Sequence, residues 1–254
     1  MTAAAATTPA PRTVIEARAL TKRFQGLVSV DAVSFAIAEN ETLGVIGPNG
    51  AGKTTLVNMI SGTLTPTEGE VIFEGRNIND VPAFRRAHLG IARTFQVMKP
   101  FHGMTVLENV AVGALFGRDG GEKSMAKARE TAREWLEFTG LGRKIDLGAD
   151  SLGGPDRKRL EFAKALAMKP RLLLLDEVMA GLNPVEVDEV VELIKTIRGQ
   201  GMAMLVIEHV VKAIRSLSDR VMVLHHGQKI ADDDPATVLE DPRVIEAYLG
   251  KRRT

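Results

Sequence analysis

Gly47-Pro48-Asn49-Gly50-Ala51-Gly52-Lys53-Thr54 is the stretch of this 254-residue chain that decides its fold. It fits the pattern G-x-x-x-x-G-K-[ST], a loop that wraps the phosphates of a nucleotide. The pattern requires a strand before the loop and a helix after it, and residues 42–46 and 53–61 have the sequences of a buried strand and a helix. Glycines let backbone N–H groups approach phosphate oxygens, and the helix N-terminus adds its positive end. The stretch therefore predicts a nucleotide site.

The motif also assigns roles to single side chains. We expect Lys53 to reach the β- and γ-phosphates, and the hydroxyl of Thr54 to bind Mg²⁺. Thr55, the next residue of the expected helix, belongs to the same candidate nucleotide site. The alternative is an ordinary glycine-rich turn, and the flanking strand and helix argue against it.

Composition narrows the class of protein. The chain has 33 Lys and Arg against 32 Asp and Glu, so no broad basic field points to nucleic acid. It has no cysteine, which excludes disulfides, cysteine-zinc sites and thiol catalysis. No apolar run approaches the roughly 18 residues of a membrane span. Residues 1–13, rich in Ala, Thr and Pro, lack the features of a signal peptide and are predicted to form a disordered tail. We therefore expect a soluble protein whose membrane role, if any, comes through a partner.

Strand and helix patterns alternate along the chain. The strands are predicted at 14–20, 28–37, 42–46, 70–73, 91–94, 171–175, 202–207 and 220–224. The helices are predicted at 53–61, 81–87, 105–140 with a break near 117–121, 157–168, 184–198, 210–216 and 242–249. This alternation predicts a largely parallel core sheet, with the helical insert of about 97–160 as a separate lobe.

The apolar strand Leu172-Leu173-Leu174-Leu175 ends in two carboxylates, Asp176 and Glu177. Ligands bind at such strand ends in open α/β sheets. We expect Asp176 to hold Mg²⁺, directly or through water, and Glu177 to polarise the attacking water. The alternative is that the two carboxylates lie in a solvated turn after a core strand. The phosphate loop upstream argues against this alternative.

Three further polar residues, Gln96, Asn183 and His209, follow apparent strands or turns. Such residues are usually surface or capping residues. Their order relative to the two phosphate motifs is what makes them candidates for function.

This order resembles the ATP-binding subunits of ABC transporters, from about residue 14 onward. The resemblance implies that Phe24 stacks on adenine, that Gln96 contacts Mg²⁺ and the membrane subunit, and that His209 contacts the γ-phosphate. It also implies that Glu177 is the catalytic glutamate and that 180–183 form the D-loop at a dimer interface. Two positions depart from the family: Val178 replaces the usual Pro, and Asn183 the usual Asp.

The implied fold is an α/β P-loop NTPase core with a mostly parallel sheet, an antiparallel β subdomain and a helical signature-loop subdomain. The implied ligands are ATP and Mg²⁺. The chain would be a single ABC ATPase cassette over 14–254, with its core at 14–96 and 161–254 and its helical lobe at about 97–160.

The signature loop is where the chain departs most from the family, which usually has L-S-G-G-Q. The aligned stretch here is Leu152-Gly153-Gly154-Pro155-Asp156-Arg157. Gly153 has no hydroxyl and Pro155 has no N–H to donate, so the contact with the partner subunit's ATP is expected to be weaker. Gly153 and Gly154 remain candidate nucleotide-binding residues. In a second possible register, Ser151 supplies the hydroxyl.

Residues 176–184 and 241–250 resemble the subgroup that energises uptake of branched-chain amino acids. The implied partners are membrane permeases and a second ATPase subunit, identical or a sister chain, at the inner face of the cell membrane, without membrane insertion. Importers of urea, short amides and aromatic acids look similar at this subunit, as does the lipopolysaccharide-export ATPase. A non-transport ABC ATPase and a regulatory module that no longer hydrolyses ATP also fit the motifs. The solute never touches this chain, so no residue identifies it.

An apolar run follows Gln96 and is the expected docking groove for the permease. Its members are Val97, Met98, Pro100, Phe101 and Met104. The alternative is that these side chains form ordinary core of the helical lobe.

Overall fold

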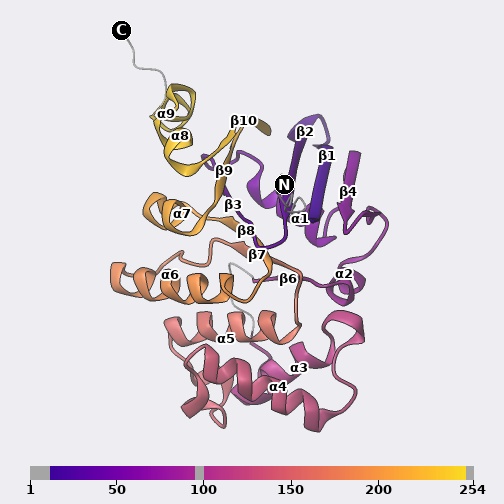
Figure 1. Cartoon of the computed structure of the whole chain (residues 1–254), viewed down its shortest axis with the longest axis vertical. Helices are drawn as coiled ribbons and strands as arrows, with labels where there is room; N and C mark the ends of the chain where they lie inside the picture. The colour runs from indigo at the N-terminus through magenta and orange to yellow at the C-terminus, as the bar shows by residue number, and fades with distance from the viewer. Residues whose placement is uncertain (1–11, 95–99, 250–254) are drawn as a thin grey trace, which may run out of the picture.

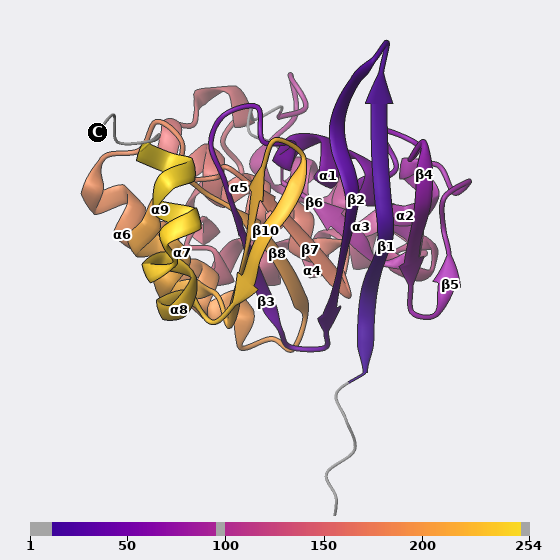
Figure 2. The same ribbon diagram turned by 90° about the horizontal axis from the view of Figure 1, so that it is seen from above.

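The computed structural model describes residues 12–94 and 100–249. Two sheets lie side by side in it (Figures 1 and 2). The smaller is antiparallel, in the order β2-β1-β4-β5. Its strands are β1 (Thr13–Phe24), β2 (Leu27–Ala38), β4 (Glu68–Phe73) and β5 (Arg76–Asn77). The predicted antiparallel subdomain is therefore present, with its first two strands longer than expected because they pair as one hairpin.

The larger sheet has the order β10-β9-β3-β8-β7-β6, and every neighbouring pair but β10–β9 is parallel. Its strands are β3 (Thr42–Ile46), β6 (Ile91–Arg93), β7 (Leu172–Asp176), β8 (Ala203–Ile207), β9 (Arg220–His225) and β10 (Gln228–Asp233). Every residue of β3, β7 and β8 is buried, which explains their continuous apolar sequences. The α/β fold with a mostly parallel sheet is confirmed.

Helices surround this sheet (Figure 1). They are α1 (Lys53–Ser61), α2 (Ala83–Leu89), α3 (Val106–Leu115), α4 (Met125–Phe138), α5 (Gly154–Ala167), α6 (Pro184–Arg198), α7 (Val211–Leu217), α8 (Pro235–Glu240) and α9 (Pro242–Leu249). Short 3-10 turns are η1 (Arg118–Gly120), η2 (Gly142–Lys144) and η3 (Ala149–Ser151). Among the described residues, none of these helices has the length and apolarity to cross a bilayer.

Among the residues that the structure describes, three apolar clusters hold the elements together, and the core sheet separates the first two. Leu172 and Leu174 of β7 belong to the cluster that contains α1 and the antiparallel sheet. Leu173 and Leu175 belong to the cluster on the other face, with α5, α6 and α7. This follows from the two-residue period of a strand. A third cluster joins α3, α4 and α5 in the helical lobe at the bottom of Figure 1.

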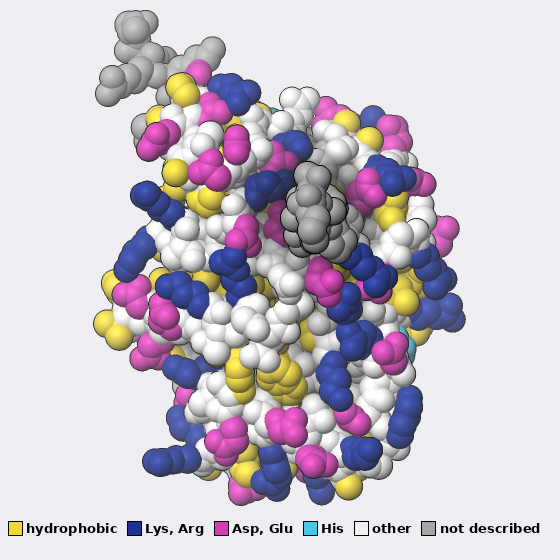
Figure 3. Space-filling view, viewed as in Figure 1, with side chains coloured by type: hydrophobic (Ala, Val, Ile, Leu, Met, Phe, Trp, Pro, Cys, Tyr) yellow, Lys and Arg dark blue, Asp and Glu magenta, His cyan; other side chains and the backbone are white. Residues whose placement is uncertain are grey.

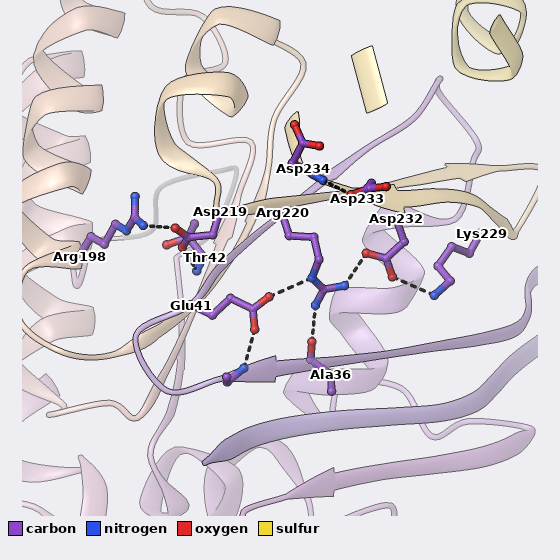
Figure 4. Close-up of polar contacts among 11 residues, drawn as sticks. Ala36, Glu41, Thr42, Arg198, Asp219, Arg220, Lys229, Asp232, Asp233 and Asp234 are labelled. Carbon is purple, nitrogen blue, oxygen red and sulfur yellow. Dashed lines mark hydrogen bonds and ion pairs between the residues drawn. The ribbon is translucent and has the colours of Figure 1, made fainter. Parts of the chain in front are cut away.

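A polar network fastens the amino-terminal ends of β3 and β9 (Figure 4). The Nε of Arg220 lies 2.9 Å from Oε1 of Glu41, and the same guanidinium also contacts Asp232 and the carbonyl of Ala36. Ala36 belongs to β2 and Asp232 to β10. Because one arginine reaches both sheets, the network fixes them to each other at the edge opposite the carboxyl ends of the parallel strands. Elsewhere, positive and negative side chains are interspersed over the face in Figure 3.

The predicted bounds of α1, α6 and α9 are confirmed, whereas α2 lies two residues further along the chain than predicted and the predicted start of α5 is wrong. Helix α5 begins at Gly154 rather than at residue 157, because Pro155 fits the first turn, where its missing N–H costs nothing. Helix α8 was not predicted, because six residues carry too little periodicity to be recognised.

Candidate functional site

The phosphate loop connects β3 to α1 and borders a hollow of about 170 Å³. The hollow is lined by Ser29, Asn49, Gly50, Ala51, Gly52, Lys53, Thr54, Thr55 and Glu177. The structure thus brings most of the predicted loop together with the predicted catalytic glutamate, although more than a hundred residues separate them in the sequence.

Two glycines of the loop lie where a side chain would not fit. Gly52 has a φ of 101°, and a Cβ there would be 2.3 Å from the carbonyl oxygen of Ser29. A Cβ on Gly47 would be 2.2 Å from the carbonyl oxygen of Leu224. The loop is therefore pressed between β2 and β9, and only glycine permits this close approach.

Lys53 is buried within the loop that precedes it. Its Nζ donates hydrogen bonds to the carbonyl oxygens of Gly47, at 2.7 Å, and Pro48, at 3.1 Å. Burial lowers the pKa of Lys53, while the nearby charges of Glu177 and Asp176 act in the opposite direction. The loop thus holds the cation of the motif close to both carboxylates.

Hydroxyl groups line the same hollow. Thr54 and Thr55 lie in the first turn of α1, where the sequence placed them. The Oγ1 of Thr55 lies 2.8 Å from Oγ of Ser29 in β2. Ser29 was missed by sequence reasoning, since a single serine in a strand carries no motif, and only the fold brings it to the loop.

Glu177 and His209 face each other across the ends of two adjacent parallel strands. Nε2 of His209 lies 2.8 Å from Oε1 of Glu177. The pairing of Asp176 with Ile207 in β7 and β8 brings both residues to one sheet edge, and the N–H of Glu177 donates to the carbonyl of Ile207 at 2.9 Å. Two residues predicted from separate strand ends are therefore one hydrogen-bonded pair.

Asp176 is almost fully buried and is paired with an arginine. Its Oδ2 lies 2.7 Å from Nη2 of Arg93, the last residue of β6. Arg93 was also missed, because its sequence position gives no sign of an ion pair 83 residues away.

The donor set fits Mg²⁺ carried on a nucleotide. The described residues contain no cluster of three or more His, Cys, Asp or Glu that could hold a metal by themselves. Mg²⁺ prefers oxygen ligands and commonly uses one or two protein groups with phosphates and water. The hydroxyl of Thr54 and the carboxylate of Asp176 are ligands of that kind.

Glu208 is a buried carboxyl group beside the pair. Its Oε1 accepts a hydrogen bond from the N–H of Met179 at 2.9 Å. Burial and, to a smaller extent, the charge of Glu177 raise the pKa of Glu208 to about 7, although the N–H groups of Met179 and His209 and the charge of Lys158 act in the opposite direction. No sequence signal marks it, since it simply continues the strand before His209.

Phe24 ends β1 and is 42% exposed, with Nζ of Lys22 5.3 Å from its ring centre. It does not line the hollow, so its role toward adenine stays a prediction. Gln96, Val97 and Met98 fall outside the described residues. Of the remaining docking residues, Phe101 is exposed, while Pro100 and Met104 are half-buried.

The signature loop forms the start of α5. Gly153 is its N-cap, with φ −71° and ψ 172°, and Gly154 is its first residue. A Cβ on either glycine would meet open space. The hydroxyl of Ser151, the second candidate for the contact, donates to the carbonyl of Gly148 at 2.7 Å. Arg157 donates to the carbonyl of Leu152 at 2.7 Å and so supports the loop from the helix.

Asn183 has a local role that needs no partner. Its Oδ1 accepts hydrogen bonds from the N–H groups of Val185 and Glu186. The side chain of Glu186 accepts in return from the N–H of Asn183 at 2.9 Å. The residue in the expected D-loop thus caps α6, as a capping box does.

Comparison with known proteins gives consistent matches. Residues 30–180 match the ABC transporter family, and residues 228–253 match the branched-chain amino acid ATP-binding cassette transporter family. The chain is 37% identical to the high-affinity branched-chain amino acid transport ATP-binding protein BraF of Pseudomonas aeruginosa, over 94% of this chain and 99% of that protein. It is 34% identical to the lipopolysaccharide export system ATP-binding protein LptB of Acidithiobacillus ferridurans, over 93% and 97%.

Solved structures agree with these sequence matches. A nucleotide-free ATP-binding cassette from an ABC transporter superposes with a TM-score of 0.84 at 31% identity, covering 94% of this chain and all of that one. The ADP conformation of MJ1267, an ATP-binding cassette of an ABC transporter, gives 0.83 at 32% identity, covering 94% and 99%.

Proposed function

The chain belongs to the ABC transporter family of ATP-binding cassettes and is an ATPase, and from this premise we propose that it powers uptake of branched-chain amino acids, or a related small polar solute, through partner permeases. The observation that supports ATP hydrolysis as the driving reaction is the hollow in which the phosphate loop meets Glu177, itself paired with His209. The four groups proposed for hydrolysis follow the carboxyl ends of neighbouring strands of one sheet: Lys53 comes after β3, Asp176 ends β7 with Glu177 next to it, and His209 comes after β8. This favours hydrolysis over a regulatory module that only binds nucleotide.

The geometry supports a division of labour among these residues. The loop N–H groups and Lys53 would bind the β- and γ-phosphates, in a site where preorganised donors stabilise developing charge. Glu177 would accept the proton of the attacking water, and His209 would hold that carboxylate and contact the γ-phosphate. Thr54 and Asp176, with Gln96, would hold Mg²⁺, which when bound supplies positive charge to the phosphoryl oxygens.

The proposal extends to a dimer. Two subunits would close head to tail, with ATP between the phosphate loop of one and the residues Gly153 and Gly154 of the other. None of the signature-loop residues lines the hollow of its own chain, which supports a site completed by a second subunit. ATP drives closure only to the extent that it binds the closed dimer better than the open one. Within each subunit, residues 14–96 and 161–254 would form the core, and residues of about 97–160 would form the helical lobe.

The direction and solute of transport rest on the relatives. BraF carries the name of a branched-chain amino acid transport protein, and the carboxyl-terminal residues match a family named for the same solutes. The likeness to LptB makes lipopolysaccharide export the second candidate. In either case the subunit would sit at the inner face of the cell membrane through its permeases.

ATPase activity measured with and without the co-purified permeases tests the proposal. We expect low activity of the isolated chain, stimulation by the permeases in vesicles, and ATP-dependent accumulation of labelled leucine inside right-side-out vesicles. Stimulation without uptake of leucine, isoleucine or valine would favour another solute or export. Absence of ATP hydrolysis under both conditions would contradict the proposal.

A further inference from the structure

Arg93 belongs to none of the sequence motifs of the site, yet its side chain ends beside the carboxylate expected to bind the metal. Its Nη2 is 2.7 Å from Oδ2 of Asp176, and the two side chains are only 12% and 4% exposed. The ion pair is therefore largely withdrawn from water, where the interaction of two charges is stronger than at the surface.

The same guanidinium also contacts the phosphate-loop helix. Its Nη1 donates to Oδ1 of Asn58 at 2.7 Å and lies 3.3 Å from Oγ of Ser61. Both residues belong to α1, whose first turn carries Lys53 and Thr54. A guanidinium is planar and its donors have a fixed geometry, unlike the single point charge of a lysine. One rigid group thus sets the position of Asp176 relative to α1.

We propose that Arg93 is a positioning residue for the metal–nucleotide complex. It holds Asp176 by Oδ2, so that Oδ1 would remain for Mg²⁺, with the hydroxyl of Thr54 as the second protein group that would hold the ion. A buried carboxylate that loses its partner is left with an uncompensated charge, and Asp176 would lose the contact that fixes it relative to α1. Arg93 prevents this and so maintains the affinity for Mg²⁺–nucleotide. The inference rests on the proposed Mg²⁺-dependent function.

A purely structural ion pair makes a different prediction. Removing it would lower stability, but it would leave the ratio of nucleotide affinities with and without Mg²⁺ unchanged. That ratio is therefore the informative measurement, and it does not depend on turnover.

The experiment is titration calorimetry of ADP into the full chain, in Mg²⁺ and in EDTA, for the wild type, Arg93→Met and Arg93→Lys. We expect ADP affinity in EDTA to stay within threefold of the wild type for both variants. The Mg²⁺ enhancement is the ratio of ADP affinity in Mg²⁺ to that in EDTA. We expect it to fall at least tenfold in Arg93→Met. We expect a smaller fall in Arg93→Lys, which keeps the positive charge but not the planar guanidinium. An enhancement retained within threefold in Arg93→Met, or increased, overturns the inference.

A control and a second variant keep the test decisive. Arg220→Met removes another partly buried arginine that pairs with carboxylates, far from the site, and should lower stability without changing the Mg²⁺ enhancement. If Arg93→Met does not fold, Asn58→Ala removes the hydrogen bond that joins Arg93 to α1. A Mg²⁺ enhancement that does not fall at least threefold in that variant overturns the inference. If the wild type itself shows no Mg²⁺ enhancement, the proposed Mg²⁺ dependence fails first. Failure of the Arg93 inference alone leaves that dependence intact.

Discussion

His209 Nε2 lies 2.8 Å from Glu177 Oε1, so the two residues that the motif order placed near the γ-phosphate are hydrogen-bonded to each other. The side chain of Glu177 is 17% exposed and that of His209 is 41% exposed. The carboxylate is therefore held by a partner that water can still reach. This pairing orients Glu177 toward the hollow that it lines.

Replacing Glu177 by Gln should stop turnover while leaving nucleotide bound. Glutamine keeps the shape and the hydrogen bond to His209 but cannot accept a proton. General-base catalysis contributes roughly a hundredfold or more, so we expect kcat to fall by at least that factor, with ATP affinity within threefold of the wild type. Steady-state ATPase assays and calorimetry measure both quantities. Glu192→Gln, at an exposed position on α6, is the control, and Glu177→Gln turnover above a tenth of normal would show that another group is the base.

Replacing Lys53 by Ala should weaken ATP binding about ten- to a hundredfold. The variant removes a charge-assisted hydrogen bond to phosphate, worth roughly 1.5–3 kcal/mol. Lys212→Ala removes a lysine whose side chain is 80% exposed and should bind ATP normally. Titration calorimetry compares the three proteins. An affinity of Lys53→Ala within threefold of the wild type contradicts the assignment.

Replacing Gly153 by Ser should tighten the ATP-dependent dimer. The position has φ −71° and open space around it, so a serine fits without strain, and at an N-cap it changes stability by only a few tenths of a kcal/mol. In the Glu177→Gln background we expect about tenfold tighter dimers by sedimentation with ATP. Gly148→Ser, at another unobstructed N-cap with φ −62° that lies outside the signature loop, is the matched control. Unchanged dimers in Gly153→Ser would instead favour Ser151 as the hydroxyl donor.

Replacing Glu208 by Gln should change the pH dependence of stability. The pKa is 4.5 as a reference value and about 7 in the folded chain, so between these values the folded state holds a proton that the unfolded state has lost. The contribution of Glu208 to the free energy of unfolding is therefore greatest below about pH 4.5, and it declines as the pH rises toward 7. Between pH 5.5 and 8 the decline is about 2 kcal/mol.

Glutamine does not titrate, so the variant should not show this decline. Between pH 5.5 and 8 its free energy of unfolding should therefore rise by about 2 kcal/mol relative to that of the wild type. Urea unfolding at the two pH values measures the difference, and Glu192→Gln should show none. A wild-type-to-variant difference that is equal at both pH values would mean that Glu208 does not carry this proton.

Continuous motifs made much of the site predictable. The phosphate loop is eight consecutive residues, and Asp176 and Glu177 directly follow an apolar strand, so local sequence located them. His209 also follows a strand, but its order relative to the two phosphate motifs is what made it a candidate. Arg93 was not, because its partner lies 83 residues away and no spacing rule connects them. Ser29 and Glu208 were missed for the same reason, since tertiary contacts alone give them their neighbours.

The double packing of α5 has a consequence for how this chain can vary. Phe162 and Leu166 pack in the sheet cluster, while Leu160 and Ala163 pack in the lobe cluster, so the helix body serves two cores at once. Substitutions there must satisfy both. Gly153, at the entrance of the same helix, meets nothing within reach of a new side chain. Packing within the chain therefore constrains the body of α5 more than the loop before it, so the loop can diverge from the rest of the family while the architecture around it is preserved.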